Sequence, residues 1–434
     1  MHTLEELRAG RLAGIKRLQL SCGLSEFPAE IYSLADSLEI LDLSNNALTT
    51  LPDDLTRLYR LRIIFCSNNP FRQLPPVLGR MPELTMAGFK SCRIEDVPAA
   101  ALPPRLRWLV LTDNRIEVLP DELGQRPLQK LMLAGNRLRA LPLSLASCTT
   151  LELLRIAANR LDALPAWLGE LPRLSWLATA GNPFSAAAAD DACPDVSWSA
   201  LTLGRQLGEG ASGVIYAATL GGSAVAVKLF KGAVTSDGLP DSEMDACIAA
   251  GAHPDLIPVL GRVVGHPAGT HGLVLSLIAP EYRNLAGPPS LDSCTRDIYA
   301  DDKRFDAASA LRIARGIASA AHHLHQRGIL HGDLYAHNIL HCPQGRPLLG
   351  DFGAASFYDC DGAQAGWLQR MEVRAFGCLL EELAERIDVS GAAAAAMVAA
   401  LSVLAAECQG TPAARPMFAD VERRLAVLAA GTEH

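Results

Sequence analysis

The first half of the chain repeats itself, and this repeat limits most strongly how the chain can fold. Seven leucines begin the same pattern at steps of 22 or 23 residues: Leu38, Leu61, Leu84, Leu106, Leu128, Leu151 and Leu174. Apolar residues follow each leucine at offsets three, five and ten, and most units carry an asparagine at offset eight. A period of this length indicates a solenoid, in which each unit buries its apolar face by stacking on its neighbours.

The unit resembles the leucine-rich repeat. The resemblance covers about eight units between residues 12 and 184 and implies an α/β solenoid, a horseshoe of short parallel strands. We expect offsets three and five to point into the core and the asparagines to satisfy backbone groups at the turn after each strand. Cys92 takes the asparagine place in one unit. Recurrent Leu-Pro pairs should start the return limb, because proline fixes the backbone there.

Two ordered motifs mark the second half. His331-Gly332-Asp333-Leu334-Tyr335-Ala336-His337-Asn338 precedes Asp351-Phe352-Gly353, and 351 − 333 = 18 places Asp351 18 positions after Asp333. They resemble the loops H-R-D-L-x-x-x-N and D-F-G of protein kinases. The resemblance implies that Asp333 accepts the proton of the acceptor hydroxyl, and that Asn338 and Asp351 hold Mg²⁺ against the phosphates of ATP.

Upstream segments extend the resemblance. Gly208-Glu-Gly-Ala-Ser-Gly213 with Ile215 looks like the glycine-rich loop, and Val225-Ala226-Val227-Lys228 looks like the strand whose lysine neutralises the ATP phosphates. The family would supply a carboxylate partner for Lys228 from a helix, and Glu243 is preferred to Asp245 because of its longer side chain. The expected ATP-binding residues are Gly208, Gly210, Gly213, Ile215, Ala226, Lys228 and Leu275. Residues 305–328 should form the long helix that positions the catalytic loop.

The second half also departs from the family pattern. Gly332 replaces the arginine that binds a phosphorylated activation loop in many kinases, so activation should not require that phosphate. Tyr335 stands where a lysine often follows the catalytic aspartate, and His337 is either a packed polar residue or a contributor to phosphate stabilisation. No Ala-Pro-Glu lies between Gly353 and Met371. Glu372 resembles the aspartate at the start of a central helix, and the partner of Arg415 is unknown.

Composition limits the binding partners and the cellular location that we expect. Lys+Arg 39 against Asp+Glu 47 gives a net charge of −8, which argues against general binding to nucleic acid or anionic membranes. The eleven cysteines show no CxxC pair and indicate reduced thiols in a reducing compartment. No apolar run is long enough for a membrane span. We expect a soluble cytoplasmic protein; delivery into a host cell is left open.

These features resemble a leucine-rich repeat protein kinase of bacterial type. We expect a repeat domain at residues 1–184, a linker at 185–196 and an α+β bilobal protein kinase domain at 197–434. The predicted function is ATP- and Mg²⁺-dependent phosphorylation of a protein, on Ser/Thr by default, with Tyr or dual specificity open. A pseudokinase scaffold and a small-molecule kinase are the alternatives.

The concave face of the repeats is expected to bind protein. Its outward strand positions are unusually apolar, and we predict a docking surface centred on Phe65, Trp108 and Trp176. The occupant could be a substrate, a second copy of the chain or the chain's own kinase lobe.

Overall fold

The computed structural model describes residues 2–185, 193–232 and 234–431. The chain forms two compact units, Met1–Leu171 with Asn182–Phe184 and Pro172–Gly181 with Ser185–His434. Residues 172–181 therefore belong to the last repeat by sequence but pack within the second unit. The predicted linker 185–196 lies largely outside the described residues, and its last two residues begin a strand.

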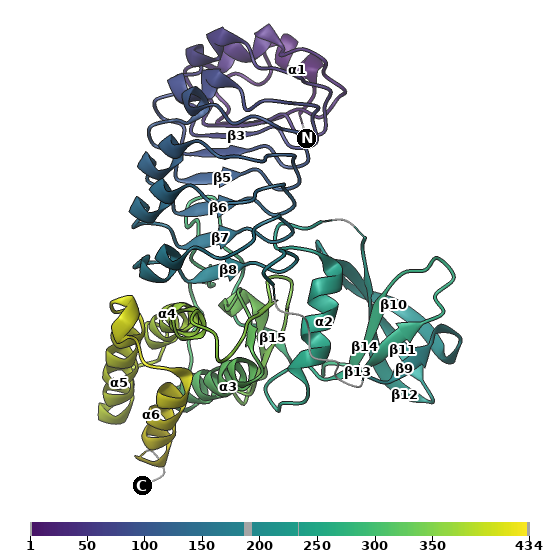
Figure 1. Cartoon of the computed structure of the whole chain (residues 1–434), viewed down its shortest axis with the longest axis vertical. Helices are drawn as coiled ribbons and strands as arrows, with labels where there is room; N and C mark the ends of the chain where they lie inside the picture. Colours follow the sequence, from purple (N-terminus) through teal and green to yellow (C-terminus); the bar gives the residue numbers. More distant parts are fainter. Residues whose placement is uncertain (1, 186–192, 233, 432–434) are drawn as a thin grey trace. The chain divides into compact units, whose positions relative to one another are not determined.

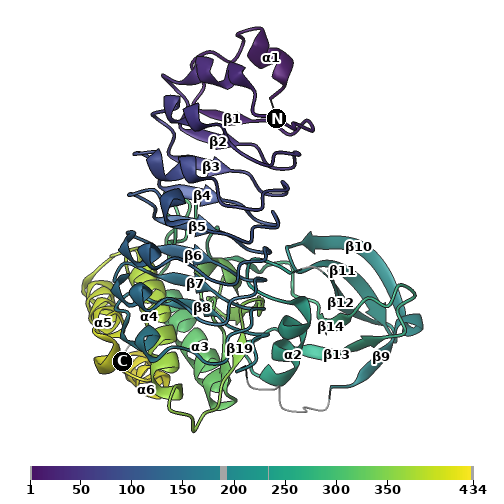
Figure 2. The ribbon, with the colours of Figure 1, turned by 45° about the horizontal axis from the view of Figure 1, so that its top comes forward.

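The first unit is a ladder of short parallel strands (Figures 1 and 2). Consecutive strands pair in register, so that Ile40 faces Ile63 and Ile63 faces Met86. Helix α1 (Leu4–Arg8) precedes β1 (Arg17–Gln19), β2 (Ile40–Asp42), β3 (Ile63–Phe65), β4 (Met86–Gly88), β5 (Trp108–Val110), β6 (Lys130–Met132) and β7 (Leu153–Arg155). This confirms the predicted solenoid.

The return limbs are 3₁₀ helices, and a proline precedes nearly every one of them in extended conformation, as the Leu-Pro pairs predict. They are η1 (Ala29–Leu34), η2 (Asp53–Arg57), η3 (Pro76–Arg80), η4 (Ala99–Ala101), η5 (Asp121–Gln125), η6 (Leu143–Ser147) and η7 (Ala166–Glu170). Apolar residues at offsets three and five, such as Leu109 and Leu111, are fully buried between strands and return limbs.

Buried asparagines join neighbouring repeats. The side-chain oxygen of Asn114 accepts from the backbone N–H groups of Cys92 (3.2 Å) and Ile94 (2.8 Å), and its amide donates to the carbonyls of Phe89 (2.8 Å) and Leu111 (2.9 Å). Asn46, Asn69, Asn136 and Asn159 make equivalent contacts. The predicted role of the asparagines is confirmed, because each satisfies backbone groups that the curved chain leaves unpaired.

The second unit combines a mixed sheet with a group of helices (Figure 1). The sheet has the order β10-β11-β12-β14-β13-β9. Its strands are β9 (Asp195–Ser197), β10 (Leu201–Glu209), β11 (Gly213–Leu220), β12 (Ser223–Phe230), β13 (Val259–Val264) and β14 (Gly272–Ser276), with η8 (Trp198–Ala200) after β9 and α2 (Pro240–Ala250) after β12. Val196 in β9 packs in the sheet core with Val227 and Val274, so this part of the predicted linker belongs to the fold.

The helical part surrounds α3, which begins where Asp306 accepts from the N–H of Ser309 (2.8 Å) and ends before Gly328 at φ +67°. Its elements are β15 (Arg283–Asn284), α3 (Ala307–Gln326), β16 (Ile329–Leu330), η9 (Ala336–Asn338), β17 (Ile339–His341), β18 (Pro347–Leu349), β19 (Ser356–Phe357), α4 (Ala365–Ala384), α5 (Ala392–Cys408), η10 (Pro412–Ala414) and α6 (Phe418–Gly431); β8 (Trp176–Ala178) also lies in this unit. Among the described residues, no helix is both long and apolar enough to cross a membrane.

We predict that Asn114→Ala destabilises the first unit by about 2–4 kcal/mol, because each buried group left unsatisfied costs about 1–3 kcal/mol. Asn46→Ala is the matched control, since Asn46 has the same place in its repeat but is only half-buried, and water can replace its contacts. Hydrogen exchange of peptides spanning 89–116 should accelerate strongly in the first variant. Equal acceleration around both sites would contradict the prediction.

Candidate active site

The glycine-rich segment forms the hairpin between β10 and β11. The N–H of Gly210 donates to the carbonyl of Gly213 (2.9 Å) and closes the turn. A β-carbon on Gly213 would lie 2.6 Å from the carbonyl oxygen of Leu229, whereas Gly208 and Gly210 face open space. Gly213 is therefore needed for packing, and the other two glycines leave the backbone open to the close approach of a phosphate.

Lys228 on β12 and Glu243 on α2 form the predicted ion pair. The Lys228 side chain is 14% exposed and that of Glu243 is 2% exposed. Burial disfavours the ammonium, but the attraction of Glu243 outweighs burial and raises the pKa of Lys228. The lysine is thus held as a cation beside Asp351, whose negative charge also favours the ammonium.

An apolar cavity of about 100 Å³ adjoins this ion pair and is lined by residues that include Ile215, Leu275 and Phe352. Ala226 is buried and lies opposite Leu275 in the β12–β14 register. The volume is below the roughly 300 Å³ of a typical ligand pocket, so the cavity encloses only part of a nucleotide. The structure thus brings together Ile215, Lys228, Glu243, Leu275 and Asp351 around one cavity.

The loop between β16 and β17 holds Asp333. The amide of Asn338 donates to both the backbone oxygen and Oδ2 of Asp333, at 2.9 Å each. His331 is fully buried; its Nδ1 accepts from the Asp333 N–H (3.3 Å), while its Nε2 lies 3.0 Å from the carbonyl oxygen of Gly350. The Asn338 amide nitrogen thus holds Asp333 in place.

Asp351 lies just after β18 with φ +56°, in the left-handed region that aspartate tolerates better than most residues. Its Oδ1 accepts from the N–H of Gly353 (3.2 Å). Carboxylate and amide oxygens, as supplied by Asp351 and Asn338, are ligands that Mg²⁺ prefers. The donor set therefore fits the predicted cation.

Glu372 anchors the catalytic loop from α4. Its side chain is 1% exposed. Oε1 accepts from the N–H of Gly332 and Oε2 lies against Nε2 of His325, both at 2.7 Å. Burial alone would raise the pKa of Glu372, but the contacts with His325 and Gly332 lower it. The expectation that Glu372 starts a helix is wrong: α4 begins at Ala365, so Glu372 lies within it.

Two family departures have structural consequences. Tyr335 is buried, and its side chain stacks on Trp176 rather than reaching toward phosphate. Nδ1 of His337 lies 2.7 Å from Oδ1 of Asp297, a residue that sequence reasoning missed. Burial would lower the pKa of His337, but Asp297 outweighs it and raises that pKa. The charge of Asp333 raises the pKa of His337 in the same direction.

Arg415 bonds only backbone carbonyls in the contacts found for the described residues. Its guanidinium donates to the oxygens of Pro172 (2.7 Å), Gly410 (3.0 Å) and Arg370 (3.3 Å). Burial, with the nearby charge of Arg374, lowers the pKa of Arg415 to about 10. The unknown partner is therefore not an acidic side chain.

The three aromatic residues of the predicted docking surface differ in environment. Phe65 lies against Gly88, and Trp108 is covered by the ammonium of Lys130 at 4.2 Å from the ring centre. Both are half-buried, and their docking role stays a prediction. Trp176 is 1% exposed and packed within the second unit. Its ring is covered by Tyr335, a residue of the second half of the chain, and the chain's own kinase lobe is one of the occupants considered above. The docking role of Trp176 likewise stays a prediction.

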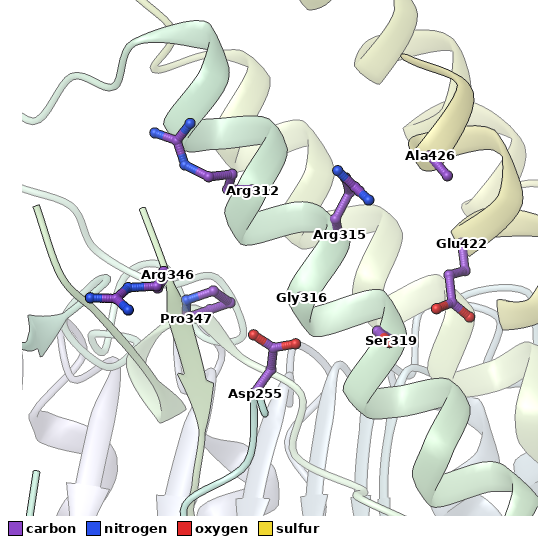
Figure 3. Close-up of a pocket in the computed structure, with 9 residues that line it drawn as sticks. All are labelled: Asp255, Arg312, Arg315, Gly316, Ser319, Arg346, Pro347, Glu422 and Ala426. Atoms are coloured by element: carbon purple, nitrogen blue, oxygen red, sulfur yellow. The ribbon is translucent and has the colours of Figure 1, made fainter. Parts of the chain in front are cut away.

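A larger cavity of about 330 Å³ lies elsewhere in the second unit (Figure 3). Arginines and acids from α3, α6 and the adjoining loops line it: Asp255, Arg312, Arg315, Arg346 and Glu422. Arg312 is engaged with the backbone oxygen of Gln344 (2.6 Å). A planar base needs an apolar slot, so the smaller cavity beside Lys228 is the better nucleotide site.

We predict that Glu372→Gln reduces the free energy of unfolding at pH 7 by about 1.5–3 kcal/mol, the range for hydrogen bonds to a charged group. Because the pKa of Glu372 is lowered in the folded state, its ionisation stabilises the fold above its ordinary value of 4.5. That stabilisation is lost as pH falls through the folded-state pKa. Urea unfolding of both proteins should converge in acid. A pH-independent difference would contradict this.

Comparisons with known proteins agree with this geometry. Residues 201–369 match the family model of the protein kinase domain, and residues 37–58 match that of the leucine-rich repeat. Leucine-rich repeat serine/threonine-protein kinase 1 of Mus musculus is 36% identical over 80 residues, 18% of this chain and 4% of that protein. CBL-interacting protein kinase 22 of Oryza sativa subsp. japonica is 31% identical over 186 residues, 41% of each chain.

Serine/threonine-protein kinase mos of Xenopus laevis is 30% identical over 165 residues, 37% of this chain and 43% of that protein. The matches thus span less than half the length of each of these relatives. The leucine-rich repeat match lies within the solenoid, and the protein kinase match includes Lys228, Asp333 and Asp351 of the candidate site. The chain thus has a match to the leucine-rich repeat in its N-terminal part and a match to the protein kinase domain in its C-terminal part.

Proposed function

We propose that this protein transfers the γ-phosphoryl group of ATP to Ser or Thr hydroxyls of protein substrates. The observation that carries the proposal is the convergence of Lys228, Glu243 and Asp351 at one cavity, with Asp333 held by Asn338 on the adjoining loop. A phosphate-binding cation, oxygen ligands for a metal and a base are the parts that phosphoryl transfer requires.

Each part has a defined task. Lys228, kept charged by Glu243, neutralises the α- and β-phosphates, and the open backbone of the hairpin at Gly208 and Gly210 approaches the phosphate oxygens. Asp333 accepts the proton of the acceptor hydroxyl as the new P–O bond forms and the bond to ADP breaks. Asn338 and Asp351 would hold Mg²⁺, which when bound neutralises charge on the β- and γ-phosphates.

The Ser/Thr assignment is supported by the names of two of the relatives. The repeats would select or position the substrate, with Phe65 and Trp108 on the binding face. A cytoplasmic location is part of the same proposal. A pseudokinase scaffold makes the opposite prediction for turnover, because it would bind nucleotide and partners without transfer.

We predict that Asp333→Asn lowers phosphoryl transfer about 10²–10⁴-fold and that Lys228→Met lowers it about 10²–10³-fold. The assay incubates the full chain with labelled ATP, Mg²⁺ and generic Ser/Thr peptides, and maps every phosphosite. Asp361→Asn, at an exposed carboxylate between Gly353 and α4, is the matched control and should retain activity. Nucleotide binding without transfer by the unsubstituted protein would instead support the scaffold.

We also predict different effects on nucleotide binding for the two aspartates. Asp351→Asn should weaken Mg²⁺-dependent binding of ATP, because this carboxylate would contact the metal, whereas Asp333→Asn should leave it nearly unchanged. Calorimetric titration of ATP at several Mg²⁺ concentrations measures the difference. Equal affinities of the two variants at every Mg²⁺ concentration would contradict these roles.

A further inference from the structure

Trp176 contacts the catalytic loop directly. Its ring lies parallel to that of Tyr335, with centres 4.1 Å apart and planes 7° apart. Its indole N–H donates to the carbonyl oxygen of Leu334 (3.1 Å). The residues that it contacts follow Asp333 immediately in the chain. Two independent contacts therefore fix the backbone and the side chain next to the proposed base.

Gly332 lies close to Leu177, the residue after Trp176. It has φ +73°, and a β-carbon there would lie 2.5 Å from the carbonyl oxygens of both Leu177 and Ala354. Real β-carbons essentially never come so close to a backbone atom. Only glycine fits between these two carbonyl oxygens. The arginine of the family pattern has no room there.

Further contacts tie residues 172–181, here called the docked segment, to the elements behind the loop. Arg374 on α4 donates to the hydroxyl of Ser175, and Arg415 donates to the carbonyl of Pro172. Arg374 lies two residues after Glu372, whose carboxylate accepts from the N–H of Gly332. Both α4 and the docked segment therefore contact the loop and hold its position.

The docked segment contacts both residues at which the loop departs from the kinase pattern. Gly332 leaves room for the backbone of the docked segment, and Tyr335 provides the surface on which Trp176 stacks.

The residues that could carry an activating phosphate between Gly353 and α4 are Ser356 and Tyr358. Ser356 is 3% exposed, and the Tyr358 hydroxyl donates to the carbonyl of His325 (3.1 Å).

We propose that Trp176 is a positioning residue for phosphoryl transfer: the docked segment holds the catalytic loop in its reactive conformation, in place of a phosphate on the segment after Asp-Phe-Gly. This inference rests on the proposed kinase function. It implies that the unphosphorylated protein is competent as folded. A loop displaced by about 1 Å can cost about 10²-fold in rate.

The test compares Trp176→Ala, Trp176→Phe and Trp167→Ala in the full chain. Trp167 is a half-buried tryptophan of the first unit and serves as the matched control. Trp176→Ala should lower kcat on a generic peptide about 10²-fold with little change in KM for ATP, because the nucleotide-binding residues are untouched. Trp176→Phe keeps an aromatic stack and should restore much of kcat. Unchanged kcat in folded Trp176→Ala would overturn the proposal.

Hydrogen exchange of residues 329–341 provides a readout that does not need turnover. Exchange there should be faster in Trp176→Phe than in Trp167→Ala, even where Trp176→Ala fails to fold. Equal exchange and equal kcat in those two variants would overturn the proposal. If the unsubstituted protein transfers no phosphate, the proposed function fails, yet the exchange comparison still tests the positioning.

Phosphatase-treated protein tests the remaining part of the inference. It should phosphorylate the peptide without a lag. A lag that prior phosphorylation at Ser356 or Tyr358 abolishes would overturn the claim that the docked segment replaces an activating phosphate.

Discussion

The carboxylate of Glu372 lies in the interior of the second unit, and the loop that holds Asp333 depends on it. Removing such a charge from water costs several kcal/mol unless hydrogen bonds compensate. Gly332 and His325 provide that compensation. The same bonds attach the loop to α4, a 20-residue helix that gives it a rigid support. Asp333 follows Gly332, so the position of the proposed base is set by this buried charge.

The solenoid was predictable because its signal repeats. A single leucine carries little information, but the same offsets in seven units leave one consistent assignment of core and turn. The asparagines followed from the same argument, since a buried turn must satisfy its backbone groups. In the second half, the ion pair of Lys228 with Glu243 was predictable, because a phosphate-binding lysine needs a carboxylate partner. The metal-binding roles of Asn338 and Asp351 stay predictions.

The parts that could not be predicted depend on contacts between distant segments. Arg415 bonds backbone carbonyls, which every residue has, so the sequence contains no signal for its partners. Trp176 occupies the same offset as Trp108, yet one is buried and the other half-buried. The offset predicts which way a strand residue points, but not what packs against it. Gly332 and Tyr335 depart from the kinase pattern in the sequence, and the residues that contact them appear only in the fold.

The docked segment also changes where the kinase domain begins. A domain starting at residue 197 would lack Trp176 and Leu177. The ring of Tyr335 would lose its stacking partner, and one of the two backbone oxygens that crowd Gly332 would be removed. The domain would also lack Val196, which packs in the sheet core. With more room at Gly332, glycine gains conformational freedom, so the loop would lose order at the residue before Asp333. Residues 172–181 therefore pack within the second unit, although their sequence pattern assigns them to the solenoid.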